Sequence, residues 1–165
     1  MKEKTEKASF AAGCFWGVEY VFLKFPGITK TRVGYMGGKT KNPTYREVCS
    51  GVTDHVETLY LEFNPAMIDY EKLLEIFFEC HDPTTMNRQG PDIGNQYRSV
   101  IFYYSEKQKS AAQKAKEKYE KILKKKVVTE IVPAQEFYDA EDYHQKYYEK
   151  SGKEPYCHIV PKVKV

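Results

Sequence analysis

The sequence has little of several features that would assign a protein to a class at once. Of its 165 residues only four are cysteine and one is tryptophan, and 26 basic and 23 acidic side chains leave a formal net charge of +3. Four cysteines are too few for a disulfide-stapled scaffold, and no stretch approaches the roughly 20 apolar residues of a membrane span. The first seven residues alternate in charge and lack the apolar core of a secretory signal. We therefore expect a soluble, cytoplasmic protein with no membrane association, and a monomer.

Two other kinds of site also have little support. The lysines between Lys107 and Lys126 are interspersed with glutamates and lack interleaved aromatic residues, so a solvated helix face is expected and nucleic-acid binding is not. Cys80-His81 and Cys157-His158 are adjacent pairs without the spacing of a structural zinc site, so no metal cofactor is expected.

The chain does contain enough apolar sequence for one folded domain. With 41% hydrophobic residues, a chain of this length buries about 70% of its unfolded surface, and we expect a single domain over 1–165, with a core at 8–135 and a C-terminal segment at 136–165. Strands are predicted at 8–12, 28–36, 55–63, 99–104 and 129–133. Helices are predicted at 14–24, 45–49, 69–81, 105–126 and 141–150, and 83–96 is expected to be a loop. This pattern predicts an α+β fold with a sheet on one side and helices on the other.

The most informative stretch, Gly13-Cys14-Phe15-Trp16-Gly17, joins a predicted strand to a predicted helix. Free backbone N–H groups and the helix dipole favour negative charge at such a junction. They predict a lowered pKa and a reactive thiolate for Cys14. The two glycines permit a tight turn, and the two aromatic rings are placed to form a small apolar pocket beside the sulfur. We interpret Cys14 as a nucleophile.

Glu57 stands out within the strand predicted at 55–63. Alternation places it on the same face as Leu59, Leu61 and Phe63, which is the more apolar face. A carboxyl on a buried face is costly and indicates pairing, protonation or function.

The other cysteines differ in their surroundings. Cys80 lies on an apolar helix and is expected in the core, whereas Cys49 lies in a polar region and is ambiguous. Cys157 lies in a loop-like tail, which indicates a resolving thiol that forms a disulfide with Cys14 after oxidation.

A different enzyme class also fits the residues alone. A Cys–His thiol hydrolase or acyl transferase needs a base near Cys14, and His55, His81 and His144 are available in the sequence.

The sequence around Cys14 resembles a known family. Gly-Cys-Phe-Trp-Gly-Val-Glu at 13–19 is similar to the signature of the A-type peptide methionine sulfoxide reductases. The resemblance continues, in order, through Gly34-Tyr35, Gly37-Gly38, 42–51, His55-Val56-Glu57, His81-Asp82-Pro83, 88–99 and 143–147. It covers nearly the whole chain.

This resemblance implies a fold and an activity. The fold is a ferredoxin-like two-layer α/β plait with a long irregular C-terminal segment. The activity is reduction of the S epimer of methionine sulfoxide, in proteins and as the free amino acid. Thioredoxin is the usual electron donor, and no metal or organic cofactor is implied.

The resemblance also implies the polar roles in the site. Cys14 attacks the sulfoxide sulfur as a thiolate, and Glu57, with a pKa raised by its apolar setting, is the general acid. Tyr45 and Tyr97 hold the sulfoxide oxygen, and Asp92 supports the site. Methionine then leaves and Cys14 remains as a sulfenic acid.

The aromatic and regenerating roles follow in the same way. Phe15 and Trp16 receive the substrate methyl group, and Cys157 is the first candidate for the resolving thiol. The tail departs from the family pattern because no glycine or further cysteine follows Cys157, so Cys49, Cys80 or an external thiol stay open as alternatives. A non-catalytic module that binds oxidised methionine in the aromatic pocket is the remaining alternative function.

Overall fold

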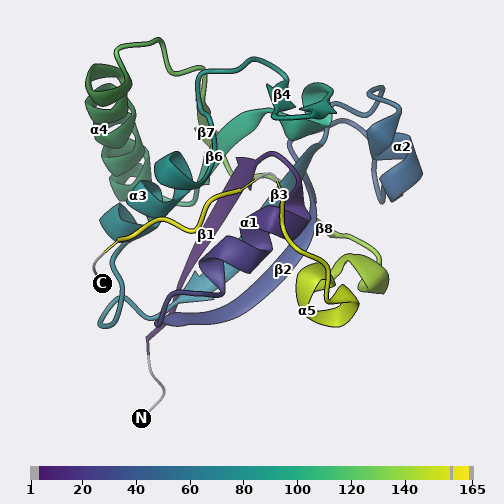
Figure 1. Ribbon diagram of the computed structural model, residues 1–165, viewed down its shortest axis with the longest axis horizontal. Coiled ribbons are helices and arrows are strands. Elements are labelled where there is room, and N and C mark those ends of the chain that lie inside the picture. The colour runs from purple at the N-terminus through teal and green to yellow at the C-terminus, as the bar shows by residue number, and fades with distance from the viewer. Residues whose placement is uncertain (1–3, 157, 164–165) are drawn as a thin grey trace.

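The fold is built around a mixed six-stranded sheet (Figure 1). The computed structural model describes residues 4–156 and 158–163. The strand order is β7-β6-β1-β3-β2-β8, and neighbouring strands are antiparallel except for β6 and β7. The bounds are β1 Glu6–Ala12, β2 Ile28–Met36, β3 Val56–Phe63, β6 Ser99–Tyr103, β7 Glu130–Pro133 and β8 Tyr138–Asp139. Together with the helices this is an α+β fold, as the sequence predicts.

Three longer helices pack with this sheet, namely α1 (Phe15–Phe22), α3 (Tyr70–Cys80) and α4 (Glu106–Leu123). Side-chain caps set where two of them begin: the Asp69 carboxylate accepts from the Lys72 N–H, and the Ser105 hydroxyl accepts from the Gln108 N–H. The shorter elements are α2 (Tyr45–Cys49), α5 (Tyr147–Ser151), the 3₁₀ turns η1 (Asn95–Tyr97) and η2 (Asp142–His144), and the hairpin of β4 (Arg88–Gln89) with β5 (Asp92–Ile93).

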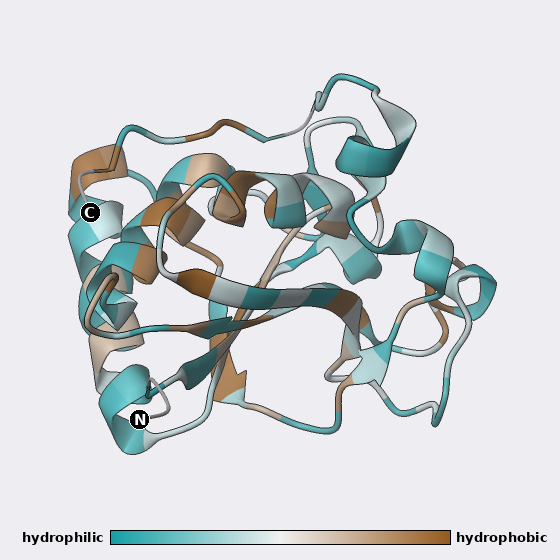
Figure 2. Ribbon diagram, turned by 90° about the horizontal axis from the view of Figure 1, so that it is seen from below, coloured by the Kyte–Doolittle hydropathy of each residue, from teal (hydrophilic) through white to brown (hydrophobic). Residues whose placement is uncertain are grey.

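The core forms where the central strands meet the helices. On β3 the alternate residues Leu59, Leu61 and Phe63 are fully buried in one apolar cluster with side chains of α1 and α3. Glu57 continues this row toward the start of α1. In Figure 2 apolar and polar residues alternate along the helices and central strands, whereas the peripheral loops are mostly hydrophilic.

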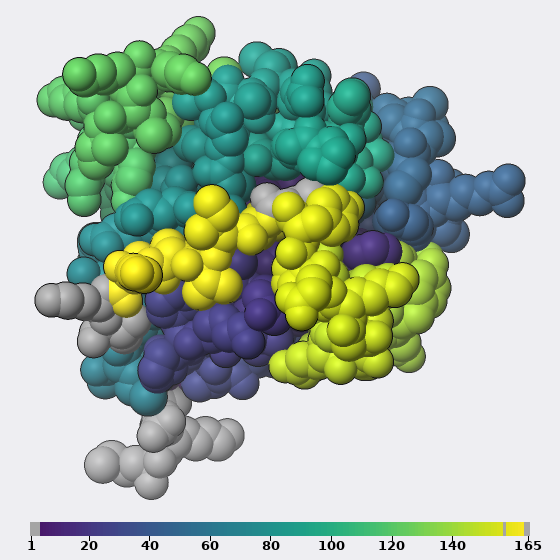
Figure 3. Space-filling model, viewed as in Figure 1, coloured from purple at the N-terminus to yellow at the C-terminus, as the bar shows by residue number. Residues whose placement is uncertain are grey.

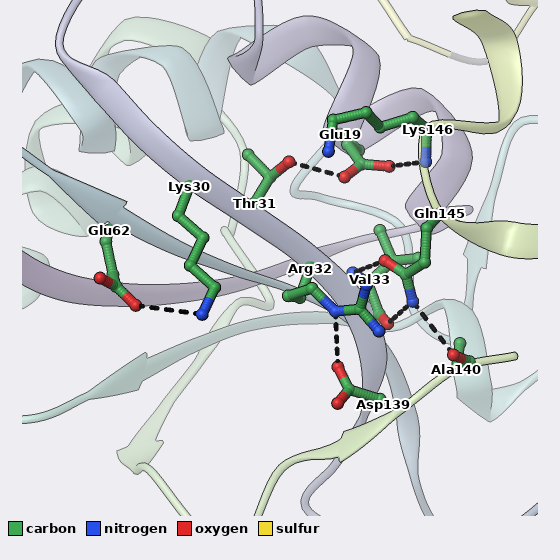
Figure 4. A network of polar contacts seen from close by, with 10 residues as sticks. All are labelled: Glu19, Lys30, Thr31, Arg32, Val33, Glu62, Asp139, Ala140, Gln145 and Lys146. Atoms are coloured by element: carbon green, nitrogen blue, oxygen red, sulfur yellow. Dashed lines mark hydrogen bonds and ion pairs between the residues drawn. The ribbon is translucent and has the colours of Figure 1, made fainter. Parts of the chain in front are cut away.

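The C-terminal segment is fastened to β2 and α1 by buried amide and carboxylate groups (Figure 4). The Gln145 side chain accepts from the Val33 N–H and donates to the Val33 carbonyl, both at 2.8 Å, and so occupies the edge of β2 as a strand would. Glu19, itself buried, accepts from the Thr31 hydroxyl and from the Lys146 N–H. This fastening fixes the segment that follows β8 against the first helix.

Most predicted elements are present, with shifts of a few residues at their ends. The stretch 83–96, expected to be a loop, contains the β4–β5 hairpin, and the helix expected at 141–150 is divided into η2 and α5. Two-residue strands carry too little alternation to be recognised in a sequence, and Lys146 in the left-handed conformation (φ 52°) interrupts the helix. Over 4–156 and 158–163, none of the helices combines the length and the apolar character needed to cross a membrane.

Candidate active site

Cys14 lies at the junction of β1 and α1, where it is the N-cap residue of the helix. Its carbonyl accepts from the N–H groups of Gly17 and Val18, which begins the helix, and Gly13 precedes it with a φ of +92°. A positive φ of this size favours glycine, so the turn depends on Gly13. The thiol is buried, with 7% of the residue exposed.

The pKa of this thiol differs from the sequence expectation. Burial raises the pKa of Cys14, and the Glu57 carboxyl adds to the rise, whereas hydrogen bonds from the N–H groups of Trp16 and Gly17 lower it. The expected effect of the helix start is therefore present, but desolvation outweighs it. The prediction of a lowered pKa is therefore wrong: the sulfur is a protonated thiol with donors in place to stabilise a thiolate.

Glu57 is buried beside this turn. Its Oε1 accepts from the Phe15 N–H at 3.1 Å, and its Oε2 has no hydrogen-bond partner among the residues that the structure describes. Burial raises the pKa of Glu57 from 4.5 to about 8, against the lowering effect of the Phe15 N–H, and Asp92 raises it further. At neutral pH the carboxyl is therefore mostly protonated, which is the state that a general acid requires.

Two tyrosines approach the same carboxyl from different elements. Tyr45 comes from the start of α2 and Tyr97 from η1, and burial followed by the charge of Glu57 raises the pKa of both hydroxyls. The charges of Asp92 and Cys14 raise the pKa of the Tyr97 hydroxyl further. Both phenols therefore remain O–H donors over the physiological pH range, in the neighbourhood of the thiol and the acid.

Aromatic rings form the other side of the site. Phe15 lies 5.8 Å from Tyr35 and 6.4 Å from Tyr45 between ring centroids, and Trp16 stacks on Tyr147 at 3.7 Å. The structure thus brings together the sequence-predicted residues Cys14, Phe15, Trp16, Tyr45, Glu57, Asp92 and Tyr97.

Several residues that support the site are not distinguished by the sequence pattern. The Glu141 carboxylate accepts from the Tyr35 hydroxyl and the Tyr45 N–H, and the Trp16 indole N–H donates to His144 Nδ1 at 2.9 Å. His144 lies in the stretch 143–147 that carries the family resemblance, whereas no sequence signal distinguishes Glu141.

The three histidines considered as a base for Cys14 bind other groups. His55 binds the Gly38 N–H and the Thr40 carbonyl, and His81 binds the Phe77 carbonyl and the Ser99 hydroxyl. His144 accepts from the Trp16 indole N–H. These contacts give no support to a Cys–His hydrolase that uses His55, His81 or His144.

The remaining cysteines lie at different depths. Cys80 is buried on α3, as expected, and Cys49 is exposed on α2 with its sulfur hydrogen-bonded to the Tyr45 hydroxyl. Cys157 lies outside the described residues. Within the described part of the chain, no group of three or more His, Cys, Asp or Glu side chains is arranged to hold a metal ion.

Comparisons with known proteins show the family to which the chain belongs. Residues 6–165 match the family model of peptide methionine sulfoxide reductase. The chain is 53% identical to peptide methionine sulfoxide reductase MsrA of Sulfolobus acidocaldarius, over 96% of this chain and 92% of that protein. It is similar to the crystal structure of Saccharomyces cerevisiae Mxr1 in reduced form, with a TM-score of 0.90, 38% identity and coverage of 94% and 92% of the two chains.

A second structure of the yeast protein shows a partner. Mxr1 in complex with Trx2 matches with a TM-score of 0.66 and 28% identity, over 96% of this chain and 94% of that one. The match of the family model along almost the whole chain and the close similarity to its curated members place this chain in the peptide methionine sulfoxide reductase family.

Proposed function

We propose that this chain is an A-type peptide methionine sulfoxide reductase that reduces the S epimer of methionine sulfoxide, in proteins and as the free amino acid. The observation that carries the proposal is the protonated, fully buried carboxyl of Glu57 beside the Cys14 thiol at the start of α1. A sulfoxide sulfur becomes electrophilic when its oxygen is protonated or strongly hydrogen-bonded, and this arrangement supplies both the proton and the nucleophile.

Each side chain has a role in the first half of the reaction. The sulfoxide oxygen accepts from the hydroxyls of Tyr45 and Tyr97 and receives a proton from Glu57, while Phe15 and Trp16 surround the methyl group. The Cys14 sulfur attacks the sulfoxide sulfur with the help of the Trp16 and Gly17 N–H groups, and an S–S bond forms. This S–S bond and the S–O bond then break as the protonated oxygen passes to the Cys14 sulfur, so that methionine leaves and Cys14 becomes a sulfenic acid. The proton that the thiol loses replaces the one given by Glu57. Asp92 supports the site through its contacts with these groups.

The second half restores the thiol. The Cys157 thiol condenses with the Cys14 sulfenic acid to give a disulfide and water, and thioredoxin reduces that disulfide. The complex of yeast Mxr1 with Trx2 supports this choice of reductant. No metal or organic cofactor takes part in this scheme.

The fold assignment is part of the same proposal. The order of β6, β1, β3 and β2 in the sheet, with α1 and α3 as connections, supports a ferredoxin-like plait in a single catalytic domain. Residues 136–165 form its C-terminal segment.

A stoichiometric experiment tests the proposed chemistry. Reduced protein, freed of external thiol, is mixed with an excess of methionine (S)-sulfoxide, and methionine is counted per chain. We expect one methionine per chain, with Cys14 oxidised in peptide mass mapping and no methionine from Cys14→Ser. Product with Cys14 still reduced would contradict the proposal, as would a Cys14→Ser variant that produces one equivalent.

A further inference from the structure

The last described residues of the chain lie across the face of the molecule that contains α1. In Figure 3 these residues, in yellow, pass over the purple first helix. The Ile159 N–H donates to the Cys80 carbonyl at 3.1 Å, Pro161 is buried, and Val163 packs against the main apolar cluster. The segment formed by residues 158–163, called here the tail segment, is therefore docked on this face.

His158 is the residue of the tail segment that contacts the turn at residues 12–17, called here the catalytic turn. Its Nε2–H donates to the Ala12 carbonyl at 2.6 Å. Because a carbonyl only accepts, this bond assigns the proton of the neutral ring to Nε2. Its Nδ1 is buried and has no hydrogen-bond partner in the described structure, and burial lowers the pKa of His158, in keeping with a neutral ring.

The ring is seated in a notch that depends on Gly17. A Cβ on Gly17 would overlap the His158 ring, with Cε1 at 2.9 Å and Cγ at 3.0 Å among its nearest atoms. A Cβ on Gly13 would make only an ordinary contact with the ring, 3.5 Å from Nε2. The notch is defined by Ala12, Gly13 and Gly17, and it is open to the ring because Gly17 has no side chain; these residues lie on either side of Cys14.

The chain before residue 157 is tied to the same site. The Tyr156 hydroxyl donates to the Asp92 carboxylate, with 3.3 Å to Oδ1. The residues on either side of Cys157 in the sequence are thus attached to Asp92 on β5 and to Ala12 at the end of β1.

We propose that His158 is a positioning residue for the regeneration of Cys14: its imidazole, seated in the notch, holds the tail segment so that the adjacent Cys157 thiol can reach the Cys14 sulfenic acid. The step it serves is condensation of the Cys157 thiol with the Cys14 sulfenic acid, in which the S–S bond forms, the S–O bond breaks and water leaves. This inference rests on the proposed function, and specifically on Cys157 as the resolving thiol. It also explains how a tail with no glycine after Cys157 can serve: the docking of residues 158–163 takes over the role of the missing glycines.

The test separates the two halves of the reaction. His158→Ala is expected to produce the first equivalent of methionine at the wild-type rate, because the ring does not touch the reacting atoms. Formation of the disulfide, measured after a pulse of methionine (S)-sulfoxide, should slow by about 10- to 100-fold, the range expected for a misplaced reactive group. Dimedone should label the Cys14 sulfenic acid in this variant and hardly at all in the wild type.

Two further variants distinguish positioning from general damage to the tail. His158→Gln keeps an N–H donor within reach of the Ala12 carbonyl and should recover most of the disulfide rate. Ile159→Ala truncates the neighbouring side chain, which is 70% exposed, and should recycle as the wild type does. Wild-type disulfide formation in His158→Ala would overturn the inference, as would equal slowing in Ile159→Ala.

The notch can also be closed from the opposite side. In Gly17→Ala the new methyl group displaces the ring, so its effect on disulfide formation and that of His158→Ala should not add in the double variant. Additive losses would contradict the seating of His158 against Gly17.

The same measurements separate this inference from the proposed function. If Cys157→Ser recycles with thioredoxin at the wild-type rate, both the resolving assignment and the positioning role are wrong. If Cys157→Ser stops after one equivalent while His158→Ala recycles normally, only the positioning role is wrong.

Discussion

Replacing Glu57 by glutamine removes the acid and keeps its shape. The amide oxygen can still accept from the Phe15 N–H, and the amide nitrogen takes the place of Oε2, which has no described partner. Any cost of leaving that nitrogen unpaired is the same at every pH. The difference between the effects of the substitution at two pH values therefore reports the ionisation of Glu57 alone.

The size of this difference follows from the pKa of Glu57, about 8 in the folded protein against an ordinary 4.5. Between these values the unfolded chain releases a proton that the folded chain keeps, so the free energy of unfolding falls as the pH rises. The loss begins near pH 4.5 and is complete above pH 8, where it reaches about 5 kcal/mol. Between pH 5.5 and pH 9 the change is about 3 kcal/mol, which corresponds to about 6–12 °C in Tm for a domain of this size.

Calorimetry of the wild type and Glu57→Gln at pH 5.5 and pH 9 measures this change. We expect the variant to gain about 6–12 °C relative to the wild type on going from the lower to the higher pH. Glu62 is a partly exposed carboxyl on the same strand, so Glu62→Gln serves as the control for replacing a glutamate by glutamine. Turnover of the wild type should fall as the pH rises through about 8, where Glu57 loses its proton. The turnover of Glu57→Gln should be lower than that of the wild type by about 10²–10⁴-fold and should not fall in this pH range. Equal Tm differences at the two pH values would refute the protonated, buried acid.

Three other substitutions test the surrounding groups. Tyr97→Phe removes an O–H donor to the sulfoxide oxygen and should lower kcat by about 10²-fold with a smaller change in KM, measured with dithiothreitol as reductant. Trp16→Phe loses the 2.9 Å bond to His144, and the free energy of unfolding in urea should fall by about 1 kcal/mol. Gln145→Ala leaves the N–H and carbonyl of Val33 without the bonds they make in the folded chain. It should lower the stability in urea by about 3 kcal/mol, and an unchanged midpoint would contradict the fastening of the C-terminal segment.

The sequence predicts the catalytic turn well because the relevant signals are local. The glycines around Cys14 and the change from strand to helix are contained in a few consecutive residues, and alternation alone places Glu57 on a buried face. The pKa of Cys14 depends on what packs over the turn, which local pattern does not report. The sequence therefore indicates the donors at the helix start but not the larger effect of burial on the pKa of Cys14.

The parts that could not be predicted depend on contacts between distant segments. The support of Tyr45 by Glu141 spans 96 residues, and the contact of His158 with Ala12 spans 146. The edge of β2 is completed by the side chain of Gln145 and by the two-residue β8, neither of which has a periodic signature. Such contacts follow from the packing of the tail and have no equivalent in a local window of sequence.

Turnover of the separated S and R epimers of methionine sulfoxide in a short peptide, with dithiothreitol as reductant, tests the central claim most directly. We expect the wild type to reduce the S epimer only and Cys14→Ser, with its fold checked by circular dichroism, to reduce neither. Turnover of the R epimer, or S-epimer turnover that survives in Cys14→Ser, would contradict the assignment of the reaction to this thiol and this pocket.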